Sequence, residues 1–352
     1  MGRILGKALF LALLALTIWF AWRLVAERRT GPAFAGPGVT AADLPQGPPR
    51  PGNLRIVTWN VRNFPRDERP QVPGLGFSRR TNPADVEAVL AGLRFDILGL
   101  EEIREPGRFL RLLEKAVPGV RFGHAFTRSG GRWGQHVGLV WREDRLAAVS
   151  PPVEVASVAL GNPDLRPALA VRLRGVREDG IDLLVVQVHL RAARKGYAVR
   201  LRQYRALARW IRDEKTRSGD ADVVVQGDFN TTGPSGGDVA AELREADRIL
   251  GEAGLRRLAN ATGCSEYWEG PGERDGVQVP SLLDQVYVSG LEERDGSVPL
   301  ESWLHCARYG CRPFLSIRGH EDGTFWDVSD HCPVTFEVRD RDMDGLAVPC
   351  GG

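Results

Sequence analysis

The chain has 352 residues, of which 43% are hydrophobic and 26% charged, as in an ordinary globular protein with a sizeable core. Its formal net charge of +2 is unevenly placed, because residues 1–52 hold six Lys or Arg against two acids and the remainder holds 41 against 43. A nearly neutral body excludes a general mode of coating polyanions, so any nucleic-acid contact must come from a local basic patch.

Residues 1–30 have the pattern of a membrane-targeting segment. Arg3 and Lys7 precede a charge-free apolar stretch from Ala8 to Trp22, which with its flanks approaches the roughly 20 residues that span a bilayer. We expect an uncleaved signal anchor, with cleavage after Ala33-Phe-Ala35 as the alternative. The protein would then be anchored in a membrane and face an extracytoplasmic space, or be secreted.

Two further segments flank the body of the chain. Residues 31–52 are rich in Pro and Gly without an apolar period, which predicts a semi-stiff linker. Residues 340–352 begin like a calcium loop but place Gly351 where such a loop needs a bidentate acid, so we expect a solvated acidic tail.

Five cysteines fall in the last ninety residues: Cys264, Cys306, Cys311, Cys332 and Cys350. The membrane signal favours an oxidising compartment and therefore disulfides. A zinc site at Cys306 and Cys311 with His305 is the minority alternative, because this spacing matches no common ligand pattern. One cysteine must stay unpaired in a monomer, and we expect it to be Cys332, a buried thiol just before a strand.

Short Val, Ile and Leu runs bounded by Gly, Pro or Asp predict strands. They cover residues 54–60, 96–100, 137–142, 168–174, 181–190, 222–228, 283–289 and 333–338. Helical patterns lie between them, over residues 82–93, 109–117, 201–211 and from 238 onward. Strands that are apolar on both faces and alternate with amphipathic helices imply sheets covered by helices.

Polar residues stand at the ends of these apolar runs. They are Asn60, Glu102, His189, Asp228 with Asn230, Asp284, and Asp330 with His331. Buried strands cannot easily hide such groups in their interiors, so these residues collect where strands emerge into a cleft. Their number predicts one shared polar site.

Six motifs carry a family resemblance in their order along the chain: Thr58-Trp-Asn-Val, Gly99-Leu-Glu-Glu-Ile, Val188-His-Leu, Gln226-Gly-Asp-Phe-Asn, Leu283-Asp-Gln-Val and Ser329-Asp-His-Cys-Pro-Val. Together they resemble the endonuclease/exonuclease/phosphatase superfamily, which includes pancreatic-type deoxyribonucleases. The resemblance covers about residues 53–339. It implies a catalytic domain of the α/β (α+β) class, a four-layer sandwich of two packed, mostly antiparallel β-sheets flanked by helices, with the site at one edge.

The chemistry of phosphodiester hydrolysis suggests a metal site in this set. Glu102 supplies a hard carboxylate suited to Mg²⁺, or to Mn²⁺, and Asn60 and Asp330 would complete or orient the coordination shell. Glu101 should point to the opposite face if its strand continues, so we expect only one of the adjacent glutamates to be a ligand.

The remaining polar tips are candidate catalytic residues. Asp228 and Asn230 project to one side of an extended segment, so the acid can align or deprotonate water while the amide donates to a phosphoryl oxygen. By resemblance, Asp284 pairs with His331, which then acts as a base or as a charged phosphate ligand. His189 is placed to contact phosphate or to protonate the departing oxygen.

Four residues are candidates for binding substrate. Relatives of the deoxyribonuclease type carry a glutamate that steadies the first catalytic histidine, whereas the aligned residue here is Gln135, which sets this chain apart from deoxyribonuclease. The other three, Arg191, Arg194 and Lys195, follow His189 in the sequence and can bind neighbouring phosphates. The alternative is that they form a solvated helix face.

We therefore expect a Mg²⁺-dependent phosphodiesterase, an exported or membrane-anchored endonuclease that acts on DNA as a monomer without a protein partner. One alternative keeps the chemistry but takes a phospholipid, as sphingomyelinases do, or an inositol phosphate or other small phosphate ester. Another is an inactive relative that only binds. The complete polar set argues against the inactive relative.

Overall fold

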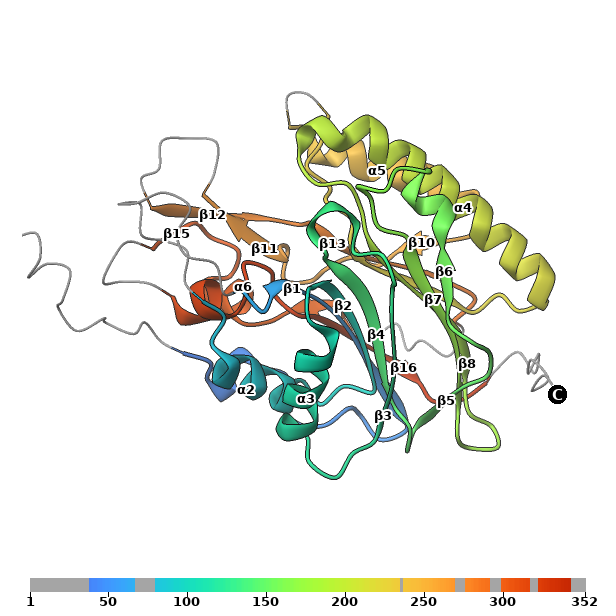
Figure 1. Cartoon of the computed structure of the whole chain (residues 1–352), viewed down its shortest axis with the longest axis horizontal. Helices are drawn as coiled ribbons and strands as arrows, with labels where there is room; N and C mark the ends of the chain where they lie inside the picture. Colours follow the sequence, from blue (N-terminus) through green and yellow to red (C-terminus); the bar gives the residue numbers. More distant parts are fainter. Residues whose placement is uncertain are drawn as a thin grey trace, which may run out of the picture.

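A computed structural model describes residues 38–66, 80–234, 237–269, 276–291, 299–316 and 322–342. Its centre consists of two β-sheets packed face to face (Figure 1). The predicted signal segment lies outside the described residues, as do the first part of the linker and most of the tail. No helix among the residues that the structure describes is long and apolar enough to cross a membrane.

The first sheet has the strand order β14-β16-β1-β2-β4-β3. Its strands are β1 (Asn53–Phe64), β2 (Ile97–Ile103), β3 (Phe122–Phe126), β4 (His136–Arg142), β14 (Glu301–Ser302) and β16 (Val334–Arg339). Neighbouring strands are antiparallel except for β1 and β2, which run parallel.

The second sheet has the order β10-β13-β9-β8-β7-β5, with β6 also paired to β7. Its strands are β5 (Leu146–Ala148), β6 (Val153–Val155), β7 (Ala168–Gly175), β8 (Asp182–His189), β9 (Val223–Asp228), β10 (Arg256–Arg257) and β13 (Asp284–Ser289). Here β8 and β9 form the parallel pair. Both sheets are mostly antiparallel, as predicted.

Helices cover the outer face of each sheet (Figure 1). The helices α2 (Pro83–Leu93) and α3 (Pro106–Ala116) pack on the first sheet, and α4 (Tyr197–Ser218) and α5 (Val239–Gly251) pack on the second. Local sequence signals start two of them, because Asn82 caps α2 before a proline and Asp238 caps α5. The result is the four-layer sandwich that the sequence predicts.

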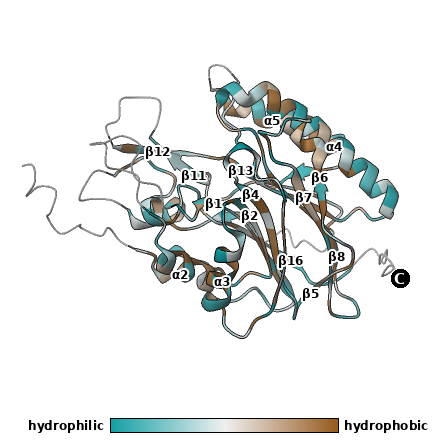
Figure 2. Cartoon of the chain, viewed as in Figure 1, coloured by the Kyte–Doolittle hydropathy of each residue, from teal (hydrophilic) through white to brown (hydrophobic). Residues whose placement is uncertain are grey.

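Three apolar clusters separate the four layers. The central cluster lies between the sheets and includes Ile56, Leu139, Val185 and Phe336, all buried. One outer cluster joins α2 and α3 to the first sheet, and the other joins α4 and α5 to the second. Figure 2 shows hydrophobic colour running along the strands, while the exposed sides of α4 and α5 are largely hydrophilic.

A smaller unit lies beside the end of β1 (Figure 1). It contains β11 (Glu266–Trp268), β12 (Val277–Ser281), β15 (Phe314–Leu315), the helix α6 (His305–Tyr309) and the helical turn η5 (Thr324–Val328). The sequence did not predict these short elements. Their buried aromatic rings, including Tyr267 and Phe325, pack around the cysteines.

Two disulfides cross-link this unit, Cys264–Cys311 and Cys306–Cys332. The prediction of a free thiol at Cys332 was therefore wrong, because the start of α6 brings Cys306 against it. Zinc ligation by Cys306 and Cys311 is excluded for the same reason, since both sulfurs are used in disulfides. Cys350 lies outside the described residues.

The domain begins earlier than its predicted boundary at residue 53. In the described part of the predicted linker, Leu44 is buried against α2, and Asp43 of the turn η1 (Ala41–Asp43) pairs with Arg308. At the other end Asp340, predicted as the start of a solvated tail, is buried and pairs with Arg145. These ion pairs anchor the start of the described chain to α6 of the smaller unit and its end to the sandwich.

Three further helical turns are η2 (Gly131–Trp133), η3 (Ala156–Ala159) and η4 (Arg194–Gly196).

Candidate active site

The carboxyl ends of the two parallel strand pairs meet at one edge of the sandwich. In the second sheet, His189 at the end of β8 lies opposite Asp228 at the end of β9. Asp284, the first residue of antiparallel β13, lies opposite Asp228 from the other side. The register of three neighbouring strands thus places an imidazole and two carboxylates in a row.

In the first sheet, an irregularity in the strands aims the polar groups. The pairing of β1 with β2 shifts register after Asn60, and Glu102 has a positive φ of 61°. A bulge of this kind re-aims a side chain, and a non-glycine residue held at positive φ is often functional. Glu102 consequently faces the site edge, where its Oε2 accepts a hydrogen bond from the backbone N–H of Asn63 at 2.9 Å.

Glu101 points the other way, as predicted. It is fully buried between the sheets, and its Oε1 accepts from the Thr58 hydroxyl and from the backbone N–H of Asp228, each at 3.0 Å. Gly227, with φ of 135°, makes this close approach possible, because a Cβ there would lie 2.8 Å from Glu101 Oε1 and 2.1 Å from the carbonyl of Val188.

The two sheets are joined across the site by short contacts. Asn60 Nδ2 donates to Asp228 Oδ2 at 3.1 Å. The Nε2 atom of His189 lies 3.5 Å from Asp228 Oδ2 and 3.7 Å from Glu102 Oε1. Four of the predicted site residues, from both sheets, therefore lie within contact distance of one another.

The smaller unit contributes the remaining groups. The Nδ1 atom of His331 lies 2.8 Å from Asp284 Oδ2, so the predicted pairing of these residues is present. His331 Nε2 then faces Asp228 Oδ2 at 3.8 Å. Ser265 fixes the carboxylate partner, because its Oγ accepts from the backbone N–H of Asp284 at 2.9 Å.

Asp330 and Glu102 lie close enough for their charges to interact. Burial and the Asp330 carboxylate raise the pKa of Glu102. Burial opposes the ionisation of Asp330, but Arg62, whose Nε is 3.1 Å away, holds the pKa of Asp330 below its usual value.

These oxygens fit a hard divalent cation. Two carboxylates and the amide oxygen of Asn60 are the kind of donors that Mg²⁺ takes while it keeps several waters. Burial, and after it the Asp330 carboxylate, destabilise the ionised form of Glu102, and a bound cation would offset both effects. Such an ion would stabilise charge on phosphoryl oxygens.

The two histidines differ in charge. Burial alone would lower the pKa of His331, but the carboxylates of Asp284 and Asp228 raise it well above its ordinary value. Burial and the nearby Arg166 cation lower the pKa of His189 well below its ordinary value. At neutral pH His331 is therefore the cation and His189 the neutral imidazole.

Burial raises the pKa of Asp228 to about 7, although His331 pulls it down. A carboxylate that titrates near neutrality is suited to accept a proton. Its Oδ1 accepts from the backbone N–H of Asn230 at 2.8 Å. The Asn230 amide donates to the carbonyl of Leu190 at 3.1 Å, which leaves its second amide hydrogen for a ligand.

The Gln135 side chain forms its hydrogen bonds with residues other than His189. Its amide oxygen accepts from Arg166 and its Nε2 donates to Asn63 Oδ1 at 2.8 Å. The Nδ1 of His189 is buried without a hydrogen-bond partner among the described residues. Gln135 instead holds Arg166 against the site, so any effect on a substrate passes through that guanidinium.

The structure adds two residues that the sequence did not predict. Arg166 is buried beside Glu102 and His189, although it precedes β7 in a loop that carries no motif. The backbone of Glu266, in β11, forms an isolated β-bridge with that of His331, and burial raises the pKa of the Glu266 carboxyl to about 8. The Arg-Pro step before an apolar strand was the one available signal for Arg166, and it is common in loops.

The candidate substrate residues separate into two groups. Arg191, Arg194 and Lys195 are exposed directly after β8, at the mouth of the site. Arg200, from the same basic run, is fully buried and pairs with Glu242 on α5. This ion pair links α4 to α5, so Arg200 is not available to bind a substrate.

Comparisons with known proteins agree with this architecture. The family model described as Endonuclease/Exonuclease/phosphatase family matches residues 57–331. A comparison with curated proteins found no match.

Three similar solved structures have a TM-score of 0.50. Danio rerio TDP2 complexed with single strand DNA product is 15% identical, over 81% of this chain and 98% of that one. The human Nocturnin catalytic domain with bound sulfate anion is 16% identical, over 81% and 94%. The mannosyl-6-phosphatase Bt3783 of Bacteroides thetaiotaomicron is 17% identical, over 80% and 98%. The fold, the edge site and the family match together show that this chain belongs to the endonuclease/exonuclease/phosphatase family of phosphate-ester hydrolases.

Proposed function

We propose that this protein is a divalent-metal-dependent phosphodiesterase, an endonuclease acting on DNA, exported or held at a membrane by its apolar N-terminal segment. The observation that carries the proposal is the meeting of Glu102, Asn60 and Asp330 with the Asp228, His189 and Asp284–His331 groups at one edge. Hydrolysis of a phosphate diester needs a cation site, a proton acceptor and a positive group for the phosphoryl oxygens.

Each of these tasks has a candidate residue. Asp228 takes a proton from the attacking water as the new bond to phosphorus forms and the bond to the leaving oxygen breaks. The cationic His331 attracts the phosphoryl oxygens, while Asp284 orients its ring and stabilises its charge. His189 enters neutral and contacts the phosphate from the other side of Asp228.

DNA is the favoured substrate because the mouth of the site is basic. Arg191, Arg194 and Lys195 are exposed next to His189, and Arg62 and Arg166 approach the site from other elements. Flanking cations are useful to an enzyme whose substrate carries a phosphate on every nucleotide. One structurally similar protein, TDP2, is known with a single strand DNA product.

The test is incubation of the purified protein with plasmid DNA, sphingomyelin vesicles and inositol phosphates, each with Mg²⁺ or with a chelator. The proposal predicts nicking of the plasmid that the chelator abolishes. Cleavage of sphingomyelin or of an inositol phosphate, with no cleavage of DNA, would show that the enzyme acts on that substrate class and is not a nuclease. No cleavage of any of the three would favour the binding-only relative.

Two substitutions test the assigned residues. His189→Ala and Asp228→Asn should each lower turnover of the cleaved substrate by about a hundredfold or more, with the far-ultraviolet circular dichroism unchanged. Glu143→Gln, an exposed carboxylate on a distant turn, is the matched control. Wild-type turnover in both site variants would remove these residues from the mechanism.

A further inference from the structure

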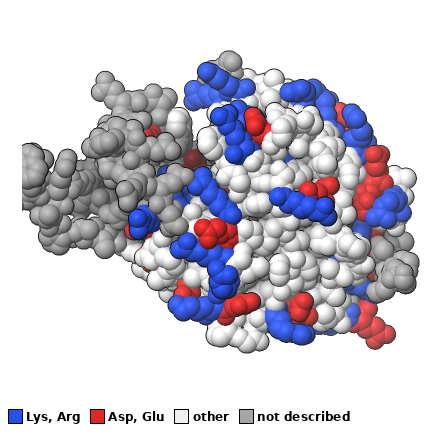
Figure 3. Space-filling model, in the orientation of Figure 1, with Lys and Arg blue, Asp and Glu red and all other residues white. Residues whose placement is uncertain are grey.

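The segment that follows His189 is the most asymmetric part of the chain in charge. Residues 191–212 contain eight Arg or Lys and no Asp or Glu, within a body whose charges nearly balance. In Figure 3, Lys and Arg side chains gather along the upper margin, where α4 and α5 lie.

Neighbouring acids compensate part of this charge. Arg200 is buried against Glu242, and Arg212 approaches Glu252 at 3.9 Å. The charge of Arg205 acts on Glu245. Five other cations have no carboxylate within 4.0 Å among the described residues, and we call them the basic track: Arg191, Arg194, Lys195, Arg202 and Arg209.

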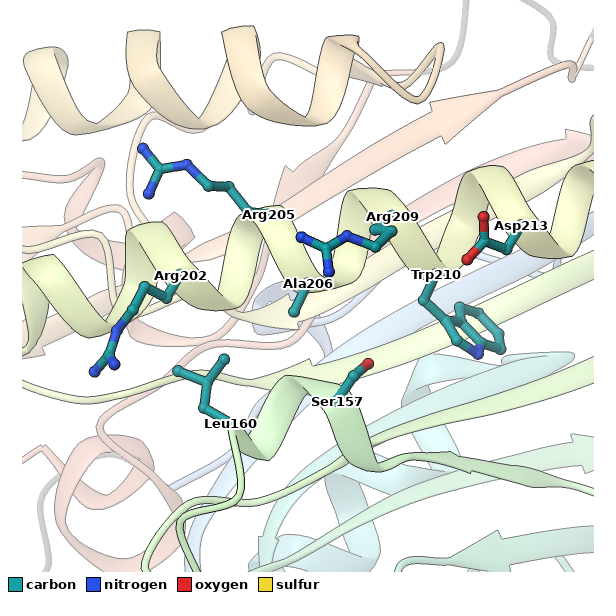
Figure 4. A pocket seen from close by; sticks show the side chains of 8 residues that line it. All are labelled: Ser157, Leu160, Arg202, Arg205, Ala206, Arg209, Trp210 and Asp213. Carbon is teal, nitrogen blue, oxygen red and sulfur yellow. The ribbon is translucent and has the colours of Figure 1, made fainter.

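The helical part of the basic track lines a groove of about 490 Å³ between α4 and η3. In Figure 4, Arg202, Arg205 and Arg209 follow one another along α4, and Ser157 and Leu160 face them from the η3 side. The half-buried ring of Trp210 lies on the same wall. Asp213, the acid that lines the groove, stands at the end farther along α4.

Both walls of the groove run back to the active site. Leu160 begins the loop that carries Arg166 to the site, and α4 begins eight residues after His189. The exposed cations Arg194 and Lys195 of η4 stand between His189 and α4 in the sequence. Exposed cations therefore follow one another along the chain from Arg191, next to the site, to Arg209 in the groove.

We propose that the basic track is an extended binding site for the phosphate backbone of a nucleic-acid strand, beyond the phosphate that is cleaved. The inference rests on the proposed function. The seven helical steps from Arg202 to Arg209 span about 10 Å, which matches about three nucleotide steps of B-form DNA. Arginines without carboxylate partners are free to pair with phosphates.

A binding measurement tests the track without requiring catalysis. The double variant Arg202→Gln, Arg209→Gln and the control Arg217→Gln are titrated with a fluorescent DNA of about 30 nucleotides in chelator, between about 50 and 200 mM salt. Arg217 lies at the far end of the same helix and pairs with Glu214. The double variant should bind about tenfold or more weakly, with a salt slope shallower by about two, and the control should match wild type.

A small phosphodiester, bis-p-nitrophenyl phosphate, separates this proposal from the proposed function. The double variant should hydrolyse it at the wild-type rate, because it has no flanking phosphates. Unchanged DNA affinity and salt slope in the double variant would overturn the track, as would an equal loss in the control. Binding of the track to phosphatidylserine vesicles in preference to DNA would also overturn it. Failure of the wild type to cleave DNA, with normal DNA binding, would overturn only the proposed function.

Discussion

Glu266 shows how a single buried carboxyl group is tolerated beside the candidate catalytic histidine. It accepts a short hydrogen bond from the Ser281 hydroxyl, and the positive charge of His331 favours its ionised form. Burial is nevertheless the larger effect and raises the pKa of Glu266 to about 8. The group is therefore protonated in the folded protein at neutral pH and ionised in the unfolded chain.

This shift predicts a pH dependence of stability. A carboxyl group whose pKa is raised on folding contributes stability that is complete below its unfolded pKa, near 4.5, and lost as the pH rises through about 8. Glu266→Gln removes the titration and keeps a hydrogen-bond acceptor for Ser281. In chelator, the free energy of unfolding of the variant should rise relative to wild type by more than about 1 kcal/mol between pH 5 and pH 8.

Urea unfolding at several pH values measures this difference. Glu143→Gln, an exposed carboxylate, should show no such trend. A constant difference between Glu266→Gln and wild type across the range would mean that Glu266 is ionised in the folded protein.

At the scale of elements, the two disulfides hold the smaller unit against the catalytic strands. Cys332 directly follows His331, and the backbone N–H of Cys306 donates to its sulfur at 3.2 Å. His305 adds a contact, because its Nε2 lies 3.2 Å from the carbonyl oxygen of Asp330. The second disulfide starts at Cys264, next to the serine that fixes Asp284.

Loss of the Cys306–Cys332 disulfide should therefore damage the site. The double variant Cys306→Ser, Cys332→Ser should lose about tenfold or more in kcat, because the adjacent metal-ligand and histidine segment is no longer held in place. Removing a native disulfide also costs stability, so circular dichroism must show that the variant is folded at the assay temperature. Cys350→Ser is the control and should retain activity. A folded double variant with wild-type kcat would show that the disulfide does not position the site.

At the scale of the whole molecule, the family resemblance implied the four-layer sandwich, and the continuous Val, Ile and Leu runs of the central strands predicted sheets covered by helices. The polar tips of those strands were predictable for the same reason, since each ends an apolar run. The smaller unit was not, because β11, β12 and β15 are short and their stability comes from disulfides and packed rings.

Long-range partners escaped prediction for a different reason. Cys332 is bonded to Cys306, which lies 26 residues earlier at the start of α6, and Arg166 interacts with Glu102 from a loop without a motif. The buried pair of Arg200 with Glu242 likewise joins two helices that are separate in sequence. Local patterns report propensity and burial, whereas these contacts depend on the assembled tertiary structure.

The central claim is that Glu102 and its neighbours bind one divalent ion at the edge of the sandwich. Its most direct test is the titration of metal-free protein with Mn²⁺, followed by electron paramagnetic resonance, for wild type, Glu102→Gln and Glu101→Gln. We expect one tight site in wild type and in Glu101→Gln, because the Glu101 side chain lies between the sheets. In Glu102→Gln the affinity for Mn²⁺ should fall at least about tenfold. Equal Mn²⁺ affinity in all three proteins would contradict it.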